Sequence, residues 1–403
     1  MENLTMEQSI TQSKTYRYSM FALLYFAQGS VLGFFTALNA IYLLSFGISM
    51  SQIGIISGIA LSPFVLKIFL GMLSDRVNFL NLGYRVPYIV IGLLIQAICL
   101  VIVPFVNPNT NFGLYGFLAF ILMTGMALYD TCTDGLALDS TPASEAGVIQ
   151  GFMVGGRALG VVVVSSLIGV LAQLVSWKVA FFFMAMITIV PLFFVLRFKE
   201  PIKISERKFQ WSAFSSFKHW PIIALGLMGA LYSLIINAAN EIVNPFLQSE
   251  FGISIMNAGF YTTVWGLGVV FGGLTGGKVT DRIGQKKSVI FAAILSFFSI
   301  LFLSFTNSSG IAWILIAMFG VAYGYYETVY FAISMRKTNL HIAASMFAIL
   351  MAIANIGTGI GLPISGILSD NIGFRWTFVV IALLNLLVFP LLTGIFRKNE
   401  ENL

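Results

Sequence analysis

Two aspartates one helical turn apart, Asp130 and Asp134, are the residues whose types and spacing point most directly to chemistry. They interrupt an apolar stretch and would share one face of a helix, with their Cβ atoms about 5 to 6 Å apart. Burial and a like-charged neighbour favour the protonated form of a carboxyl group, whereas a nearby cation favours the ionised form. The pair is therefore a candidate for binding and releasing a proton.

Lys67, Arg157 and Glu327 are further ionisable residues inside apolar stretches. On insertion scales a charge at the centre of a membrane helix costs about 2.5 to 3.5 kcal/mol, so each is a functional candidate. At a rise of about 1.5 Å per residue, Lys67, Asp130 and Glu327 lie roughly 12 to 13 Å from the loop that ends their helix, and Arg157 roughly 16 Å along its own. We expect all of them in one layer, and Glu241 nearer the opposite end of its helix.

We assign proton coupling to Asp130, Asp134 and Glu327, and substrate binding to Lys67 and Arg157. A permanent structural bridge from Asp130 to Lys67 or to Arg157 is the alternative. Lys67 could instead extend its ammonium group to the lipid head groups. For Glu327, which has no cationic residue near it in its own helix, a role in proton binding or substrate contact and a purely structural role are equally favoured.

Uncharged polar residues in otherwise apolar stretches are weaker candidates. Cavity lining is the preferred role, and hydrogen bonding between helices is the alternative for any single asparagine. With Glu241 and the tyrosines that precede two of the buried acids, the further expected substrate-binding residues are Gln28, Asn39, Tyr129, Asn240, Glu241, Asn244 and Tyr326. Cys99 and Cys132 fall at different depths and indicate neither a disulfide nor a metal site.

These residues must be positioned by membrane helices, because 58% of the 403 residues are hydrophobic and only 9% are charged. That composition excludes a water-soluble fold. About 20 apolar residues span a bilayer as a helix. We expect an all-α membrane protein with twelve spans, near residues 19–45, 52–73, 87–105, 113–137, 146–172, 177–197, 220–247, 255–277, 288–305, 311–335, 342–366 and 374–396.

The net charge of +6 does not indicate a nucleic-acid partner, because the basic residues follow the loops. Lys178 and Arg375 lie in odd-numbered loops and Lys67 and Arg157 in helices, whereas the others lie at the ends of the chain or in even-numbered loops. The positive-inside rule then predicts cytoplasmic termini in the inner membrane.

An internal repeat predicts two six-helix bundles, at residues 1–198 and 220–403, joined by a cytoplasmic linker at 199–219. Residues 46–49 and 251–254 both read Phe-Gly-Ile-Ser, and Tyr-Asp-Thr at 129–131 corresponds to Tyr-Glu-Thr at 326–328. Parallel repeats of this kind hold substrate between the bundles near the midplane.

Two loop motifs suggest a conformational latch, formed by Gly71, Asp75, Arg76, Gly277, Asp281 and Arg282. Glycine permits close helix approach. An aspartate at a helix end can bind a neighbouring helix terminus or an arginine in one conformation and release it in another. The motifs resemble the signature of the major facilitator superfamily after helices 2 and 8, and residues 366–370 are a weaker echo.

The first 160 residues resemble the branch of muropeptide permeases and acetyl-coenzyme A transporters, to which folate-biopterin transporters are related. Residues 25–29, 62–67, 130–139, 145–147 and 156–160 carry the resemblance. It implies that Gln28, Lys67, Asp130, Asp134 and Arg157 form the polar core of the first bundle. Tyr129 and Leu136 depart from the usual pattern of the fourth helix.

The resemblance implies proton-coupled symport of an organic solute, often anionic or amphiphilic, by alternating access. A proton-antiport exporter of lipophilic drugs or lipids is the alternative. With two histidines and no nucleophile, metal or nucleotide motif, the sequence does not indicate an enzyme. A non-transporting receptor or assembly factor is a third possibility. We expect a monomer with no cofactor, whose partners are the solute, protons and the bilayer.

Overall fold

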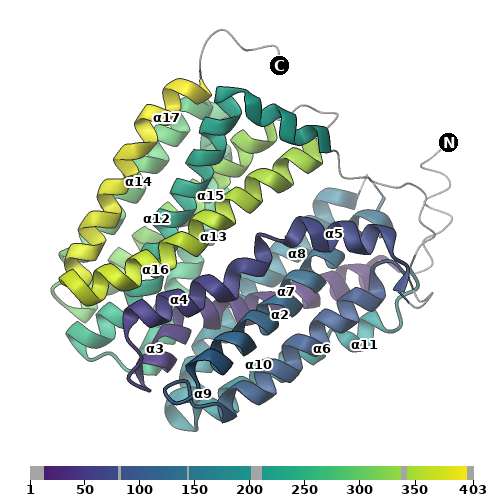
Figure 1. Ribbon diagram of the computed structural model, residues 1–403, viewed down its shortest axis with the longest axis horizontal. Coiled ribbons are helices and arrows are strands. Elements are labelled where there is room, and N and C mark those ends of the chain that lie inside the picture. The colour runs from purple at the N-terminus through teal and green to yellow at the C-terminus, as the bar shows by residue number, and fades with distance from the viewer. Residues whose placement is uncertain (1–12, 80–82, 143–144, 201–210, 337–342, 397–403) are drawn as a thin grey trace.

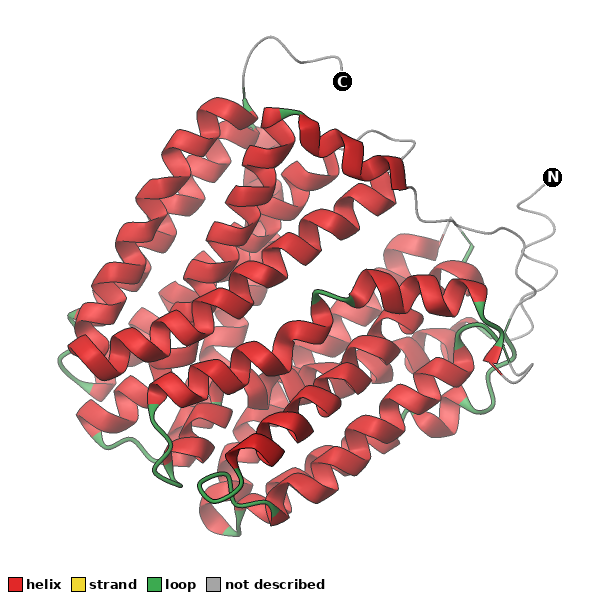
Figure 2. Cartoon of the chain, in the orientation of Figure 1, coloured by secondary structure: helices red, strands yellow, loops and turns green. Residues whose placement is uncertain are grey.

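A computed structural model describes residues 13–79, 83–142, 145–200, 211–336 and 343–396, and within these ranges the regular structure is helical (Figure 2). A membrane-spanning backbone must satisfy its own hydrogen bonds, and a helix does so within one segment.

Two groups of helices follow one another along the chain (Figure 1). The N-terminal bundle comprises α2 (Lys14–Ala37), α3 (Asn39–Leu44), α4 (Met50–Leu61), η1 (Ser62–Phe64), α5 (Lys67–Arg76), α6 (Val86–Ile102), η3 (Val103–Phe105), α7 (Phe112–Ser140), α8 (Ala146–Leu159), η5 (Gly160–Val164), α9 (Ser165–Leu174), α10 (Trp177–Ile189) and α11 (Leu192–Val195). The C-terminal bundle comprises α12 (Trp220–Phe251), α13 (Ile255–Ile283), α14 (Gln285–Ser304), α15 (Ser309–Arg336), α16 (Ala343–Leu384), η7 (Asn385–Leu387) and α17 (Val388–Ile395), and is preceded by η6 (Trp211–Lys218).

The described helices account for the expected spans. Ten stretches are long and apolar enough to cross a membrane, and one of them, Ser345–Ile395, has 51 residues. Gly373 interrupts that stretch with a φ of 78°, so it provides two spans. The 29-residue helix α13, which is not among the ten, supplies the twelfth. The protein is thus an all-α, multi-pass membrane protein.

The two bundles meet closely at one end. We name this end the closed face: α4 begins and α12 ends there, whereas the terminal face carries the start of α2 and the end of α17. Near the closed face α4 lies against α16, and the two helices diverge toward the terminal face (Figure 1). A Cβ atom on Gly54 would lie 2.3 Å from Leu362 O, and one on Gly366 would lie 2.1 Å from Met50 O. Only glycine permits this approach of the backbones.

Two helices of the N-terminal bundle are irregular beside their cations. Pro63 supplies no backbone N–H, and a short 3₁₀ turn, η1, separates α4 from α5, which begins at Lys67. Three residues after Arg157, the chain forms one π-helical turn, η5. Such turns leave carbonyl groups without the usual helical partner, and π-bulges frequently occur at functional sites.

Candidate substrate and proton site

Lys67 joins the two aspartates that the sequence singles out. Its Nζ forms an ion pair with Asp130 Oδ2 and lies 3.4 Å from Asp134 Oδ2. Asp130 is buried, whereas the side chain of Asp134 is 42% exposed and that of Lys67 is 31% exposed. The hydroxyl group of Tyr25 donates a hydrogen bond to Asp134 Oδ1. Because α5 starts at Lys67, the break in the second span directs this ammonium group toward α7.

This geometry shows how two of the alternatives stand in this conformation. Asp130 is bridged to Lys67, and the ammonium group of Lys67 turns inward instead of reaching the head groups. With one cation between two carboxylates, the cluster carries an excess negative charge when both aspartates are ionised. Asp134 is the more accessible of the two, so it is the carboxyl group best placed to exchange a proton with water.

Arg157 is positioned by close packing of α8 on α2. A Cβ atom on Gly29 would lie 2.1 Å from Arg157 O, and one on Gly156 would lie 2.3 Å from Ala22 O. The backbone of Arg157 is therefore pressed against α2, and its side chain projects away into an exposed position. An exposed guanidinium group at this depth can bind a carboxylate or phosphate through two parallel hydrogen bonds.

Arg157 and Glu327 carry opposite charges and belong to different bundles, on α8 and on α15. Glu327, on α15, is partly exposed, and among the described residues it forms no ion pair with Arg157 within 4.0 Å. Nearby, Tyr323 donates a hydrogen bond to Asn237 Oδ1 at 3.0 Å. Arg157 is exposed and Glu327 is partly exposed, so both charged groups are accessible to water in this conformation.

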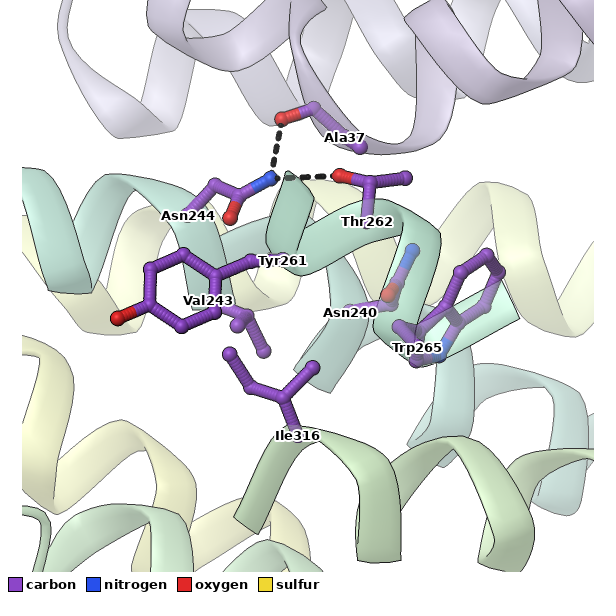
Figure 3. Close-up of a pocket in the computed structure, with 8 residues that line it drawn as sticks. All are labelled: Ala37, Asn240, Val243, Asn244, Tyr261, Thr262, Trp265 and Ile316. Atoms are coloured by element: carbon purple, nitrogen blue, oxygen red, sulfur yellow. Dashed lines mark hydrogen bonds between the residues drawn. The ribbon is translucent and has the colours of Figure 1, made fainter. Parts of the chain in front are cut away.

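The structure places Asn240, Glu241 and Asn244 elsewhere, at the closed face. They lie in the contact between the two bundles there, which we name the seam. Asn240 Nδ2 donates to Thr36 O at 3.0 Å, and Asn244 Nδ2 donates to Ala37 O at 2.9 Å. Both asparagines line a cavity of about 10 Å³, which is close to the room that one water needs (Figure 3). In this conformation they join the bundles, as the hydrogen-bonding alternative expected, and leave little room for a solute.

The remaining expected substrate-binding residues are buried within a bundle. Asn39 is fully buried and accepts a hydrogen bond from Tyr115 at 3.0 Å. Gln28 and Tyr129 are almost fully buried, and Tyr326 packs on the ring of Tyr232. These four residues are therefore not exposed to a solute between the bundles in this conformation.

The six expected latch residues lie toward the terminal face. A Cβ atom on Gly71 would lie 3.2 Å from Thr131 Cγ2, whereas one on Gly277 would make only an ordinary contact at 3.8 Å. Arg76, Asp281 and Arg282 are exposed near their helix ends, and the side chain of Asp75 lies outside the described residues.

The weaker echo of the motif forms a bond between the bundles at the closed face. The Asp370 carboxylate accepts hydrogen bonds from Met50 N at 3.1 Å and from Ser51 N at 2.7 Å. It also accepts one from the hydroxyl group of Ser51. Asp370 therefore caps the N-terminus of α4, where the first backbone N–H groups have no helical partner.

Other residues of the site carry no sequence signal. Ser57, Asn355 and Thr263 each bond across the two bundles, with Glu241, with Phe64 O and with Val162 O respectively. Hydroxyl and amide side chains are common in membrane helices, so these three could not be distinguished before the packing was known. Tyr25 belongs to the helix 1 motif, but its bond to Asp134 depends on the tertiary structure.

Comparison with known families shows to which family the chain belongs. A model of the BT1 family matches residues 28–240, and one of the Major Facilitator Superfamily matches residues 225–402. The chain belongs to the BT1 family. The resemblance to the major facilitator superfamily and to its muropeptide permease branch is thereby confirmed.

Individual relatives of this BT1 family protein are transporters. It is 24% identical over 335 residues to the transporter AmpG 2 of Rickettsia typhi, which covers 79% of this chain and 81% of the relative. It is 26% identical over 228 residues to the sialic acid transporter NanX of Escherichia coli, covering 53% and 54%.

Solved structures confirm the fold. A mutant of the nucleoside transporter NupG superimposes with a TM-score of 0.81 at 14% identity, covering 94% of this chain and all of that chain. A bacterial homologue of the lysosomal transporter Spinster gives 0.75 at 16% identity, covering 94% and 97%. The protein is a membrane transporter of the major facilitator type and not an enzyme.

Proposed function

We propose that this protein is a proton-coupled symporter of an organic solute that carries an anionic group, of the muropeptide-like class. The observation that carries the proposal is the layer between the bundles. It contains the exposed Arg157 from one bundle and the partly exposed Glu327 from the other, together with a lysine that neutralises only part of the charge of Asp130 and Asp134. Arg157 would bind the anionic group of the solute, and Asp130, Asp134 and Glu327 would be the proton-coupling residues.

The division into bundles supports alternating access. Hydrogen bonds and glycine contacts join the bundles at the closed face, and α4 and α16 diverge toward the terminal face. With the termini in the cytoplasm of the inner membrane, as the basic loops predict, this conformation would be the one open to the cytoplasm. We further propose that the functional unit is a monomer, with the solute and protons as its partners.

Uptake by the purified full-length protein in liposomes with an imposed proton gradient tests the proposal. The solutes are muropeptides, acyl-coenzyme A thioesters and pterins, with lipophilic drugs for comparison, and binding is measured first as thermal stabilisation. We expect Asp130→Asn and Glu327→Gln to abolish gradient-driven uptake. Glu250→Gln, at an exposed residue of α12, is the matched control and should transport normally.

Arg157→Ala separates the symporter from the exporter. A solute from the first three classes whose stabilising effect is lost in this variant supports the proposal. Stabilisation by lipophilic drugs alone, unchanged by the substitution, would instead favour the proton-antiport exporter. Normal pumping by the Asp130 and Glu327 variants would refute the assignment of the coupling residues.

A further inference from the structure

Glu241 is a carboxyl group that the proposed cycle has not used. It lies on α12 at the closed face, it is 5% exposed, and its Oε1 accepts a hydrogen bond from the hydroxyl group of Ser57 at 2.7 Å. Ser57 belongs to α4 in the other bundle, so this bond crosses the seam. The carboxyl group is thus buried by the meeting of the two bundles.

The surroundings of Glu241 contain no compensating cation. Among the described residues the carboxyl group forms no ion pair, and no neighbouring charge acts on it. The nearest polar residues along its own helix are Asn237, Asn240 and Asn244, which are neutral. The helix α4 has no charged residue, and the charged residues of α2 and α13 lie toward the terminal face.

The other titratable groups on the helices around α12 either have partners other than Glu241 or lie at another depth. Glu327 lies in the second half of α15, toward the terminal face, and Asp370 caps α4. Arg375 pairs with Glu250 at the closed face. The hydroxyl groups of Tyr323 and Tyr261 donate to Asn237 and to Ser309 O, and Tyr42 packs among aromatic rings. Among the described residues, Ser57 is therefore the hydrogen-bond partner of the Glu241 carboxyl group.

A buried carboxylate without a cation costs several kcal/mol, and one hydrogen bond from a neutral hydroxyl group offsets only part of that cost. The protonated acid avoids the cost. When the seam opens, Ser57 separates from Glu241 and water can solvate the ionised form. The closed seam must then bind a proton at this position more tightly than the open seam does.

We propose that Glu241 is a proton-binding site whose occupancy holds the closed face shut. The site lies at a different depth from the charged layer, since Ser57 precedes Lys67 by ten residues, or roughly 15 Å of helix. Release of the proton from Glu241 would permit the seam to open, and binding would close it again. The inference rests on the proposed alternation of the two faces, but not on the identity of the solute or on its coupling.

The distance between the two bundles at the closed face tests the proposal. Spin labels are attached to cysteines introduced at Thr110 and Asn307, which are exposed in loops of different bundles. The buried Cys99 and Cys132 are replaced by alanine. In the purified full-length protein in lipid nanodiscs, double electron–electron resonance then gives the populations of the closed and open seam as a function of pH.

In the otherwise unsubstituted protein we expect the open population to increase with pH, by up to about tenfold per pH unit. Glu241→Gln, which is permanently neutral and nearly isosteric, should keep the short distance at every pH. The matched control Glu250→Gln, on the same helix, should retain the dependence. The same dependence in Glu241→Gln as in the unsubstituted protein, or none in the unsubstituted protein, would overturn the inference.

The measurement distinguishes this inference from the proposed function. It uses no solute, so a failure to find solute-coupled uptake leaves its result interpretable. Thermal unfolding and monodispersity of Glu241→Gln show whether the variant is folded. If it is not, Glu241→Asp, which remains titratable, must retain the pH dependence, and its loss there counts against the proposal.

Discussion

Asn355 of α16 donates a hydrogen bond from Nδ2 to Phe64 O at 3.2 Å, at the point where the second span is broken. The break frees this carbonyl group from helical bonding, and Asn355 of the opposite bundle satisfies it. Thr263 makes the matching contact, donating to Val162 O within the π-helical turn that follows Arg157. The irregular segments before Lys67 and after Arg157 thus both accept hydrogen bonds from side chains of the C-terminal bundle.

Asn355→Leu should weaken the closed face, because the bond to Phe64 O is lost. A hydrogen bond of this kind contributes about 0.5 to 1.5 kcal/mol, so the open population should rise roughly 2- to 12-fold. A cysteine introduced at Ala37, which is buried in the seam, should then react faster with a water-soluble maleimide. Asn371→Leu is the control, since Asn371 Nδ2 bonds within its own helix, to Ile367 O. Equal reactivity in both variants would argue against the role of Asn355.

Lys67→Met should destabilise the protein because it leaves the buried Asp130 without its cation. Removing one partner of a buried ion pair costs up to about 3 to 5 kcal/mol. The double variant Lys67→Met with Asp130→Leu should recover most of the stability in thermal unfolding while remaining inactive in transport. Lys278→Met, at an exposed lysine, should change stability by less than about 0.5 kcal/mol. If the double variant is no more stable than the single one, the unpaired Asp130 carboxylate is not the cause of the lower stability.

Gly156→Ala should displace α8 from α2, since the added Cβ atom would lie 2.3 Å from Ala22 O. Overpacking of this kind costs about 1 to 3 kcal/mol and should also lower solute affinity by moving Arg157. Gly155→Ala is a control one residue away, because no atom lies within 4 Å of its added Cβ atom. Similar melting temperatures for the two variants would show that the α2–α8 contact tolerates a methyl group.

The ion pairs of Glu145, which lies outside the membrane spans, predict that the stability of the folded protein depends on pH. Its carboxylate lies 2.6 Å from Lys14 Nζ and 2.6 Å from Arg17 Nη2, and it accepts a hydrogen bond from Tyr18. The hydrogen bond from Lys14, with smaller contributions from Tyr18 and Arg17, lowers the pKa of Glu145 below the ordinary 4.5. Since the folded-state pKa is the lower one, the stabilisation is complete above pH 4.5 and is lost as the pH falls through that lowered value.

Thermal unfolding at a series of pH values measures this contribution. The difference in melting temperature between the unsubstituted protein and Glu145→Gln should be largest at neutral pH and should decrease at acidic pH. A constant difference over the whole series would mean that Glu145 acts through its shape and not through its charge.

Much of the layer could be predicted from the sequence because depth and helical face are local properties. The distance to the helix ends predicts one level for Lys67, Asp130, Arg157 and Glu327, and the spacing of one turn places Asp134 on the same face as Asp130. The structure brings Lys67 to the two aspartates and leaves Arg157 exposed. The roles of these residues in coupling and binding remain predictions.

The sequence by itself determined that the chain crosses the membrane as helices, because apolar runs of this length admit no other backbone structure in lipid. It also determined that Lys67, Asp130, Arg157 and Glu327 lie within spans, since depth follows from position along a helix. Only the tertiary structure decided which partner each residue has: Lys67 for Asp130, Ser57 for Glu241, and the N-terminus of α4 for Asp370. These pairings depend on which helices approach closely enough through glycine and on where a helix breaks, and neither is fixed by residues close in the sequence.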